Sequence, residues 1–368
     1  MGRSNKIIKI LYTIPNFNTA GSGKVLYDLA KGLDSERFEV SIACNHNKGS
    51  FFKEVEALGL PIYIIDSTVP LRPYYSLFLR IRPFKNFVKS HQFDIVHSWH
   101  WSSDWTEALA TRLLGVKWLY TKKAMGFNNK HWKIRSYLAS FIVTINNEMN
   151  AYFPNKKQQA LIPLGIDTDY YNSNLFKVKT PVVTDEFHII TVANLVPVKG
   201  IQILINAVHK LNDSNVKLTV LGDYDSDYGK DMVVLKDRLG MHQQVRFLGK
   251  KLDVRPDIAA ADLYVIPTLD EGRKEGMPMA LVEAMCMAIP VLGSNITGIN
   301  FVLKDFDNLL FQPENIEELA LKINEIRLLS VEDKTSLGTS LRNYCMSHFS
   351  LQSFIEAHET LYLKLVDI

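Results

Sequence analysis

Carboxylates and glycines gather in residues 267–284, where a predicted strand is followed by a predicted helix. Pro278 stands at the expected first turn of that helix, and Glu283 lies about one and a half turns further on. A carboxylate there can accept hydrogen bonds from ribose hydroxyls, and free N–H groups around Gly276 and Met277 can hold a phosphate. The segment favours a nucleotide site, and a capped helix with solvated glutamates is the alternative.

A lysine occupies an unusual position in residues 194–200, between another predicted strand and helix. Lys199 is expected at a helix N-terminus, where the helix dipole is positive and a cation costs stability. Its useful role there is to bind an anion together with the N–H groups of the helix end. Asn194 directly follows the strand and is included among the candidate binding residues.

Two histidines follow the predicted strand at 93–96. His97 and His100, with Asp104 nearby, lie where parallel sheets usually form their sites. Imidazole is the side chain most easily poised to exchange a proton at neutral pH, so a functional role is favoured over a structural one. No third ligand follows at helical spacing, and we expect no metal site here.

Glycines follow the first predicted strand, in residues 18–24. Gly21 and Gly23 would let the backbone approach a ligand, and Lys24 stands at the start of a helix. The pattern is neither a P-loop nor a dinucleotide fingerprint, because Leu26 replaces the third glycine. An anion site and a plain tight turn both remain open.

The composition is that of an ordinary globular protein. The 368 residues are 47% hydrophobic and 22% charged, with a net charge of +3, which is too small to indicate a nucleic-acid partner. Three scattered cysteines argue against a disulfide framework or a cysteine-based zinc site. No apolar run reaches the ~18–20 residues needed to cross a bilayer. We expect the basic, apolar N-terminal stretch to form a strand rather than a signal peptide, and the protein to be cytoplasmic.

Positive charge is concentrated in residues 70–135, which carry twelve Lys and Arg and three Asp and Glu. Aromatic residues are interleaved with these charges. Such a pattern suits an anionic membrane surface or an anionic acceptor. A solvated helix face above core aromatics is the alternative, and the sequence leaves both open.

Short apolar runs alternate with amphipathic helices along the chain, as parallel sheets with crossover helices require. The same alternation begins again after a polar linker at 170–186. We therefore predict an α/β protein with an N-terminal Rossmann-like domain at 1–170 and a second one at 171–350. A last helix in 351–368 is expected to pack back on the first domain.

Together these residues resemble the retaining glycosyltransferases of family four, and the resemblance covers essentially the whole chain. Glu275 and Glu283 form its strongest element, a pair of glutamates with seven residues between them. Further segments occur in the family's order: 162–167 (Ile-Pro-Leu-Gly-Ile-Asp), 221–223 (Leu-Gly-Asp), 245–249 (Val-Arg-Phe-Leu-Gly) and 288–291 (Ala-Ile-Pro-Val). The resemblance implies the GT-B fold, in which two Rossmann-like domains face each other across a cleft.

The resemblance also implies roles. Lys199 would stabilise the leaving nucleoside diphosphate, Glu275 would hold the donor sugar, and Glu283 would bind the ribose. Gly21 and Gly23 would approach the donor diphosphate or the acceptor. The remaining donor-binding residues would be Asn194, Gly276, Met277 and Pro278. Lysine and helix N–H groups supply preorganised charge stabilisation in place of a metal, so we expect neither a metal nor another cofactor.

Three departures from the family pattern leave alternatives open. Asn194 stands where the family has an arginine, and Arg273 is one candidate to replace it. The histidines are spaced differently, so His100 is preferred for the reaction centre and His97 is kept as a candidate. Four residues appear inserted, which selects Glu275 and keeps Glu271 as a second candidate.

The expected activity is metal-independent transfer of a hexose from a nucleotide-sugar donor to a glycan or lipid-linked acceptor, in polysaccharide biosynthesis. A catalytically silent binding subunit and a nucleotide-sugar 2-epimerase are the alternatives. The basic segment further predicts peripheral association with the inner face of the membrane, with no nucleic-acid partner.

Overall fold

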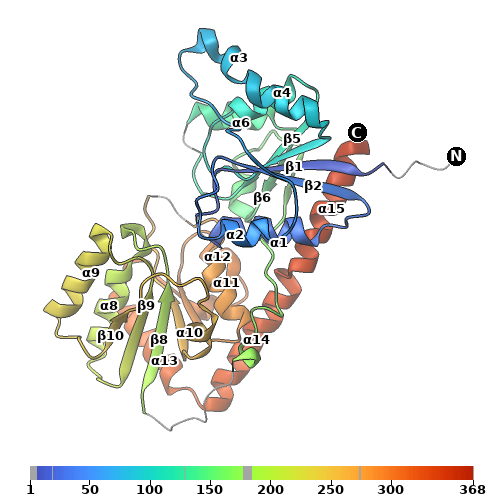
Figure 1. Cartoon of the computed structure of the whole chain (residues 1–368). Helices are drawn as coiled ribbons and strands as arrows, with labels where there is room; N and C mark the ends of the chain where they lie inside the picture. Colours follow the sequence, from blue (N-terminus) through green and yellow to red (C-terminus); the bar gives the residue numbers. More distant parts are fainter. Residues whose placement is uncertain (1–5, 19, 128, 177–184, 273–274, 368) are drawn as a thin grey trace. The chain divides into compact units, whose positions relative to one another are not determined.

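Two compact units make up the chain in the computed structural model, which describes residues 6–18, 20–127, 129–176, 185–272 and 275–367 (Figure 1). The first unit comprises Met1–Gly165 and Leu351–Ile368, and the second comprises Ile166–Ser350. The division between Gly165 and Ile166 lies a few residues before the position that the sequence suggested.

A seven-stranded parallel sheet forms the centre of the first unit, in the order β3-β2-β1-β4-β5-β6-β7. Its strands are largely buried apolar runs, as a sheet covered on both faces requires. They are β1 (Ile8–Ile14), β2 (Phe38–Cys44), β3 (Ile62–Ile64), β4 (Ile95–Ser98), β5 (Lys117–Lys122), β6 (Phe141–Thr144) and β7 (Gln159–Leu161).

Crossover helices connect these strands, and the last helix of the chain belongs to the same unit. The helical segments are α1 (Ala20–Gly32), α2 (Phe52–Glu56), the 3-10 turn η1 (Tyr74–Ser76), α3 (Leu77–Arg80), α4 (Arg82–His91), α5 (Thr106–Arg112), α6 (Lys130–Leu138), α7 (Asn147–Asn150) and α15 (Leu351–Asp367). Among the described residues, the helices lack the combined length and apolar character that a membrane crossing needs.

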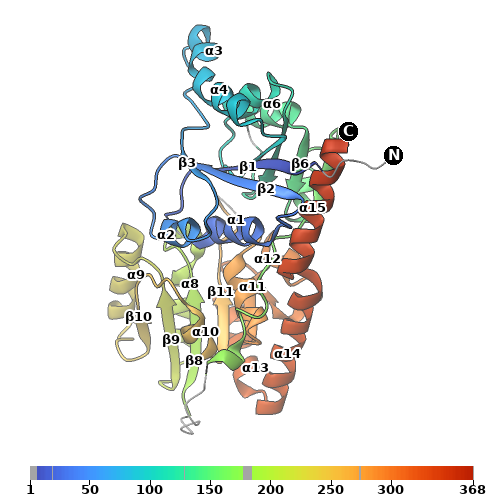
Figure 2. The ribbon, with the colours of Figure 1, turned by 45° about the vertical axis from the view of Figure 1, so that its right-hand side comes forward.

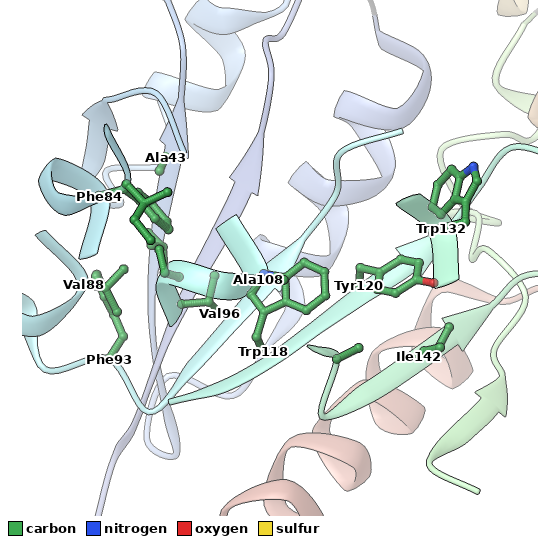
Figure 3. Close-up of a cluster of buried hydrophobic side chains, with 14 of the residues drawn as sticks. Ala43, Phe84, Val88, Phe93, Val96, Ala108, Trp118, Tyr120, Trp132 and Ile142 are labelled. Carbon is green, nitrogen blue, oxygen red and sulfur yellow. The ribbon is translucent and has the colours of Figure 1, made fainter. Parts of the chain in front are cut away.

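An aromatic core lies between helices α4, α5 and α6 and the strands of this sheet (Figure 3). Phe84, Trp118 and Trp132 are buried in it, although all three come from the basic segment. These three aromatic residues therefore belong to the core and do not form part of a membrane-binding or acceptor-binding surface. Arg135 and Lys122 are also buried, so they cannot contribute to a charged surface.

The second unit repeats the architecture with six parallel strands, in the order β10-β9-β8-β11-β12-β13. These are β8 (Phe187–Val192), β9 (Val216–Leu221), β10 (Val245–Phe247), β11 (Leu263–Ile266), β12 (Val291–Ser294) and β13 (Leu310–Phe311). The helical segments are η2 (Ser173–Leu175), η3 (Pro197–Lys199), α8 (Ile201–Lys210), α9 (Asp227–Arg238), α10 (Arg255–Ala259), α11 (Met279–Cys286), α12 (Ile299–Val302), η4 (Asp307–Leu309), α13 (Ile316–Leu328) and α14 (Val331–His348). The predicted pair of Rossmann-like α/β domains is thereby confirmed.

Candidate functional site

Each sheet has one place where the strand order reverses. In the first unit this lies between β1 and β4, and in the second between β8 and β11. Ligands of open α/β sheets bind beyond the carboxyl ends of the strands at such points. His100, Asn194, Lys199 and Glu275 lie in the segments that follow β4, β8 and β11. Gly21 and Gly23 lie in α1 after β1, and Glu283 lies in α11 after β11. His97 was expected after its strand but lies within it, because β4 extends to Ser98.

A partly accessible ion pair lies at the reversal point of the second unit. Lys199 ends the 3-10 turn η3 after β8, and its Nζ pairs with Oε1 of Glu275, in the segment after β11. The two side chains are 21% and 22% exposed. Both charged groups are therefore held by the protein and yet open to solvent, so a ligand could exchange with either partner.

Close backbone packing fixes this pair. Gly200 adopts a φ of +65°, and a Cβ there would lie 2.0 Å from the carbonyl oxygen of Pro267. Gly298, with a φ of +87°, has no room for a Cβ, which would lie 2.4 Å from the carbonyl oxygen of Glu275. Gly200 therefore lets the segment after β8 approach the segment after β11, and Gly298 lets the segment after β12 approach Glu275.

Helix α11 begins directly beyond Glu275. Gly276 and Met277 are buried, and Pro278 precedes the first helical residue. The half-buried Glu283 lies close enough to Tyr264 that its charge adds to burial in raising the pKa of that phenol. The Tyr264 hydroxyl donates to the carbonyl of Val192 at 3.4 Å, which connects β11 to the end of β8.

The other candidates of this unit are less well defined. Asn194 and Glu271 are both exposed, and Arg273 lies outside the described residues. Sequence reasoning missed Thr268, which is buried in the segment after β11. Its hydroxyl has no hydrogen-bond partner among the residues that the structure describes. Only its position two residues after a strand end could have drawn attention to it.

The glycine segment of the first unit contains an irregular start of helix α1. Gly21 has non-helical dihedral angles, φ −11° and ψ −111°, within α1. Gly23 packs closely on Phe17, whose Cδ1 would lie 3.0 Å from an added Cβ. The backbone is therefore tightly folded here, while Lys24 is paired with Asp28 four residues further along the helix.

His97 has no exposed surface and is enclosed by polar partners. Its Nδ1 lies 2.7 Å from the Tyr362 hydroxyl of α15, and its Nε2 lies 2.8 Å from Oγ1 of Thr121. The Tyr362 hydroxyl in turn lies 3.0 Å from that of Tyr12. This chain of hydrogen bonds ties the last helix to the first sheet. In the described structure it leaves no ring atom of His97 for a ligand.

His100 is also buried, with its Nε2 2.9 Å from Oγ of Ser67. Burial, reinforced by the charges of Arg135 and Lys123, lowers the pKa of His100 to about 3. Burial likewise keeps the pKa of His97 well below its ordinary value. The expectation of an imidazole poised at neutral pH is therefore wrong for both histidines, which stay neutral.

A buried charged network lies beside these histidines, and sequence reasoning missed it. Glu107 of α5 accepts hydrogen bonds from Oγ1 of Thr13 and, at 2.6 Å, from Oγ of Ser98. Arg135 of α6 donates to the same Ser98 oxygen at 3.0 Å and to the carbonyl of Asp104. Burial raises the pKa of Glu107, and the guanidinium opposes that shift. The network ties β1, β4, α5 and α6 together.

Comparisons with known proteins agree with this arrangement. A family model described as "Glycosyltransferase Family 4" matches residues 19–170, and one described as "Glycosyl transferases group 1" matches residues 172–340. A capsular polysaccharide biosynthesis glycosyltransferase of Staphylococcus aureus is 22% identical, with 84% of this chain and 88% of the relative covered. The UDP-Gal:alpha-D-GlcNAc-diphosphoundecaprenol alpha-1,3-galactosyltransferase of Escherichia coli is 22% identical, with 91% of each chain covered.

Solved structures share the fold. A glycosyltransferase from Rickettsia africae superposes with a TM-score of 0.84 at 18% identity, covering 98% of this chain and 99% of the other. Anabaena HepE, in complex with UDP and glucose, superposes with a TM-score of 0.80 at 21% identity, covering 96% and 99%. The fold and the family matches define a glycosyltransferase with the GT-B fold. The chain belongs to the family-four type of these enzymes.

Proposed function

We propose that this glycosyltransferase retains the anomeric configuration of the sugar and binds its nucleotide-sugar donor at the Lys199–Glu275 pair. The observation that carries the proposal is this partly exposed ion pair at the strand reversal of the second unit. This pair supplies a cation that can bind the diphosphate of a donor and a carboxylate that can accept hydrogen bonds from the hydroxyls of its sugar.

The proposed chemistry uses both members of the pair. When the bond between the anomeric carbon and the diphosphate breaks, negative charge grows on the departing phosphate oxygen. Lys199, helped by the backbone N–H groups of Gly276, Met277 and Met279, stabilises that charge without a metal. Glu275 accepts hydrogen bonds from the sugar hydroxyls, and Glu283 accepts those of the ribose. The acceptor hydroxyl oxygen forms the new bond to the anomeric carbon on the face that the diphosphate leaves, and its proton passes to the departing phosphate oxygen.

The first unit contributes neutral groups in this proposal. His100 acts as a neutral hydrogen-bonding group toward a substrate of the first unit, because its low pKa excludes a cationic role at physiological pH. Gly21, which is exposed at the irregular start of α1, lets a substrate approach the backbone, and the buried Gly23 packs on Phe17 beneath it. Asn194 adds no charge, so Lys199 and the backbone N–H groups carry most of the diphosphate stabilisation.

The relatives suggest the substrates. The named Escherichia coli enzyme uses UDP-galactose and a diphosphoundecaprenol-linked acceptor, and HepE was solved with UDP and glucose. We propose a UDP-hexose donor and a lipid-linked glycan acceptor, within the biosynthesis of a polysaccharide. Such an acceptor lies in a membrane, so the enzyme would work peripherally at the cytoplasmic face.

A product assay tests this function directly. The protein is incubated with a panel of UDP-sugars and a diphosphoundecaprenol-linked acceptor, with and without EDTA, and the linkage is examined by NMR. We expect UDP release coupled to a new linkage with the donor's anomeric configuration, unchanged by EDTA. An inverted linkage would contradict retention, and loss of activity in EDTA would contradict metal independence. Conversion of the donor without an acceptor would instead indicate an epimerase.

A further inference from the structure

We propose that residues 72–82 of the first unit form a tip that inserts apolar side chains into an anionic lipid surface. This inference extends the proposed function, since a lipid-linked acceptor requires contact with a bilayer. It names the part of the basic segment that makes this contact. The tip contains α3 and its two flanking turns, and it lies at the far end of α4, away from the sheet of its own unit (Figure 2).

Four large apolar side chains of the tip point into solvent. Tyr74, Tyr75, Phe78 and Leu79 are 53%, 90%, 65% and 68% exposed. Tyr74 and Tyr75 lie in the turn η1, and Phe78 and Leu79 lie in α3, which follows it directly along the chain. Scattered exposed apolar residues are normal, but a contiguous group of this kind indicates a binding surface.

The fold holds these side chains outward. Leu77, Ile81, Phe84 and Val88 bury the opposite stripe of α3 and α4. The Arg80 guanidinium donates to the carbonyls of Arg72 at 2.6 Å and of Pro73 at 2.7 Å, and more weakly to that of Leu71. The turn that carries the two tyrosines is thus fastened to α3, and their exposure is built into the structure.

The basic residues around the tip favour binding to an anionic surface. Between Asp66 and Asp94 the chain carries five Lys and Arg and no Asp or Glu. Arg72 and Arg82 flank the apolar group along the chain and are exposed, and Lys89 is exposed about two turns further along α4. Tyrosine favours the level of lipid headgroups, while phenylalanine and leucine enter the acyl region. An apolar centre inside a purely cationic rim matches an anionic bilayer better than a protein surface of mixed charge.

Vesicle sedimentation of the full chain tests the inference. One set of vesicles is phosphatidylcholine alone, and the other is an equal mixture with phosphatidylglycerol. We expect binding to the mixed vesicles and a marked loss in about 1 M salt, where the Debye length is about 3 Å. Combining Tyr75→Ser, Phe78→Ser and Leu79→Ser should weaken binding at least about tenfold. Combining Arg82→Ser and Lys89→Ser should weaken it about fivefold per charge.

A matched control removes exposed apolar side chains at a different place, and so tests whether the position of the tip matters. Leu328 and Val331 are 74% and 75% exposed in the second unit, in the company of Glu325 and Glu332. The double variant Leu328→Ser, Val331→Ser should bind vesicles within about twofold of the wild type.

Three outcomes would overturn the inference. They are equal binding to both vesicle types, unchanged binding of the tip variant, and a change in oligomeric state of that variant by light scattering. The last would show that a second copy covers the tip. Stabilisation by UDP is measured on the same variants and should not change. A protein that makes the glycosidic product but ignores vesicles would contradict the tip and leave the proposed function standing.

Discussion

The two sheets carry charged clusters at corresponding edges, and the clusters differ in their access to solvent. Beyond β1 and β4, Glu107 and Arg135 are fully buried and share Ser98 as a hydrogen-bond partner. Beyond β8 and β11, Lys199 and Glu275 pair with each other while about a fifth of each side chain stays exposed. Both pairs stand where an open α/β sheet binds ligands.

The difference separates a structural use of charge from a chemical one. A buried charge must be compensated by protein groups, which then have little capacity left for a substrate. A partly exposed pair pays less desolvation and can exchange its partner for a diphosphate or a sugar hydroxyl. The first cluster should therefore govern stability, and the second should govern binding and turnover.

Removing the buried cation should have the largest effect. Arg135→Met leaves the Glu107 carboxyl without its compensating charge, and we expect a loss of about 3–5 kcal/mol in the free energy of unfolding. Denaturant unfolding of the full chain measures it. Adding Glu107→Gln should recover part of the loss, because the uncompensated charge disappears. A single variant within about 1 kcal/mol of the wild type would contradict a structural role.

Changing the exposed pair should affect turnover and leave the fold unchanged. Lys199→Ala and Glu275→Gln should each lower kcat on the order of 10²–10³-fold, because each removes a group that stabilises the transition state. Lys210→Ala, which breaks an exposed pair with Glu317 in the same unit, is the matched control and should leave kcat nearly unchanged. Equal effects of Lys199→Ala and Lys210→Ala would refute the assignment.

Acid should destabilise the first unit, because it contains the buried, neutral His100. The folded-state pKa of His100, about 3, lies below its unfolded value near 6.5, so the unfolded state binds more protons in between. The stability that depends on neutral His100 is present above pH 6.5 and falls by up to about 1.4 kcal/mol per pH unit below it. His100→Gln should flatten this slope by about one proton in unfolding measurements. The opposing contribution of Glu107, whose pKa is raised, is common to both proteins. Parallel slopes would show that His100 does not titrate as inferred.

Restoring the family's arginine should have the smallest effect. Asn194→Arg adds a cation at an exposed position after β8, and we expect nucleoside diphosphates to bind up to about tenfold more tightly. Asn194→Gln lengthens the side chain without adding a charge, so this variant should bind nucleoside diphosphates as the wild type does. Calorimetric titration compares the three proteins. Weaker binding by the arginine variant would indicate that Asn194 makes a specific contact.

Much of the fold followed from sequence patterns. The alternation of short apolar runs and helices predicted the α/β architecture of both units, and the strand expected at 93–96 is observed as β4, two residues later. Helix α4 was missed because its basic residues and Pro83 hide a narrow apolar stripe. Helix α6 was missed because its buried residues are Trp132, Arg135 and Ser136, which give no apolar period. The strand β7 was missed as well, since three half-exposed residues give no clear period.

The site was predictable only in part. Lys199 and Glu275 were predicted from their positions after strands, and Glu283 from its spacing relative to Glu275. The burial of Glu107 and Arg135 was invisible, because each looks like an ordinary surface charge on its own helix and becomes buried only through tertiary packing. The low pKa of His100 has the same origin, since sequence does not reveal desolvation.

Nucleotide binding by the exposed pair is the central claim, and a thermal-shift titration tests it most directly. Wild type and Lys199→Ala are titrated with UDP, GDP and ADP. We predict that UDP at 100 times its dissociation constant stabilises the wild type by about 2.7 kcal/mol, and that the variant needs at least about tenfold more ligand. Stabilisation of neither protein by any nucleotide, or equal stabilisation of both by UDP, would contradict the account.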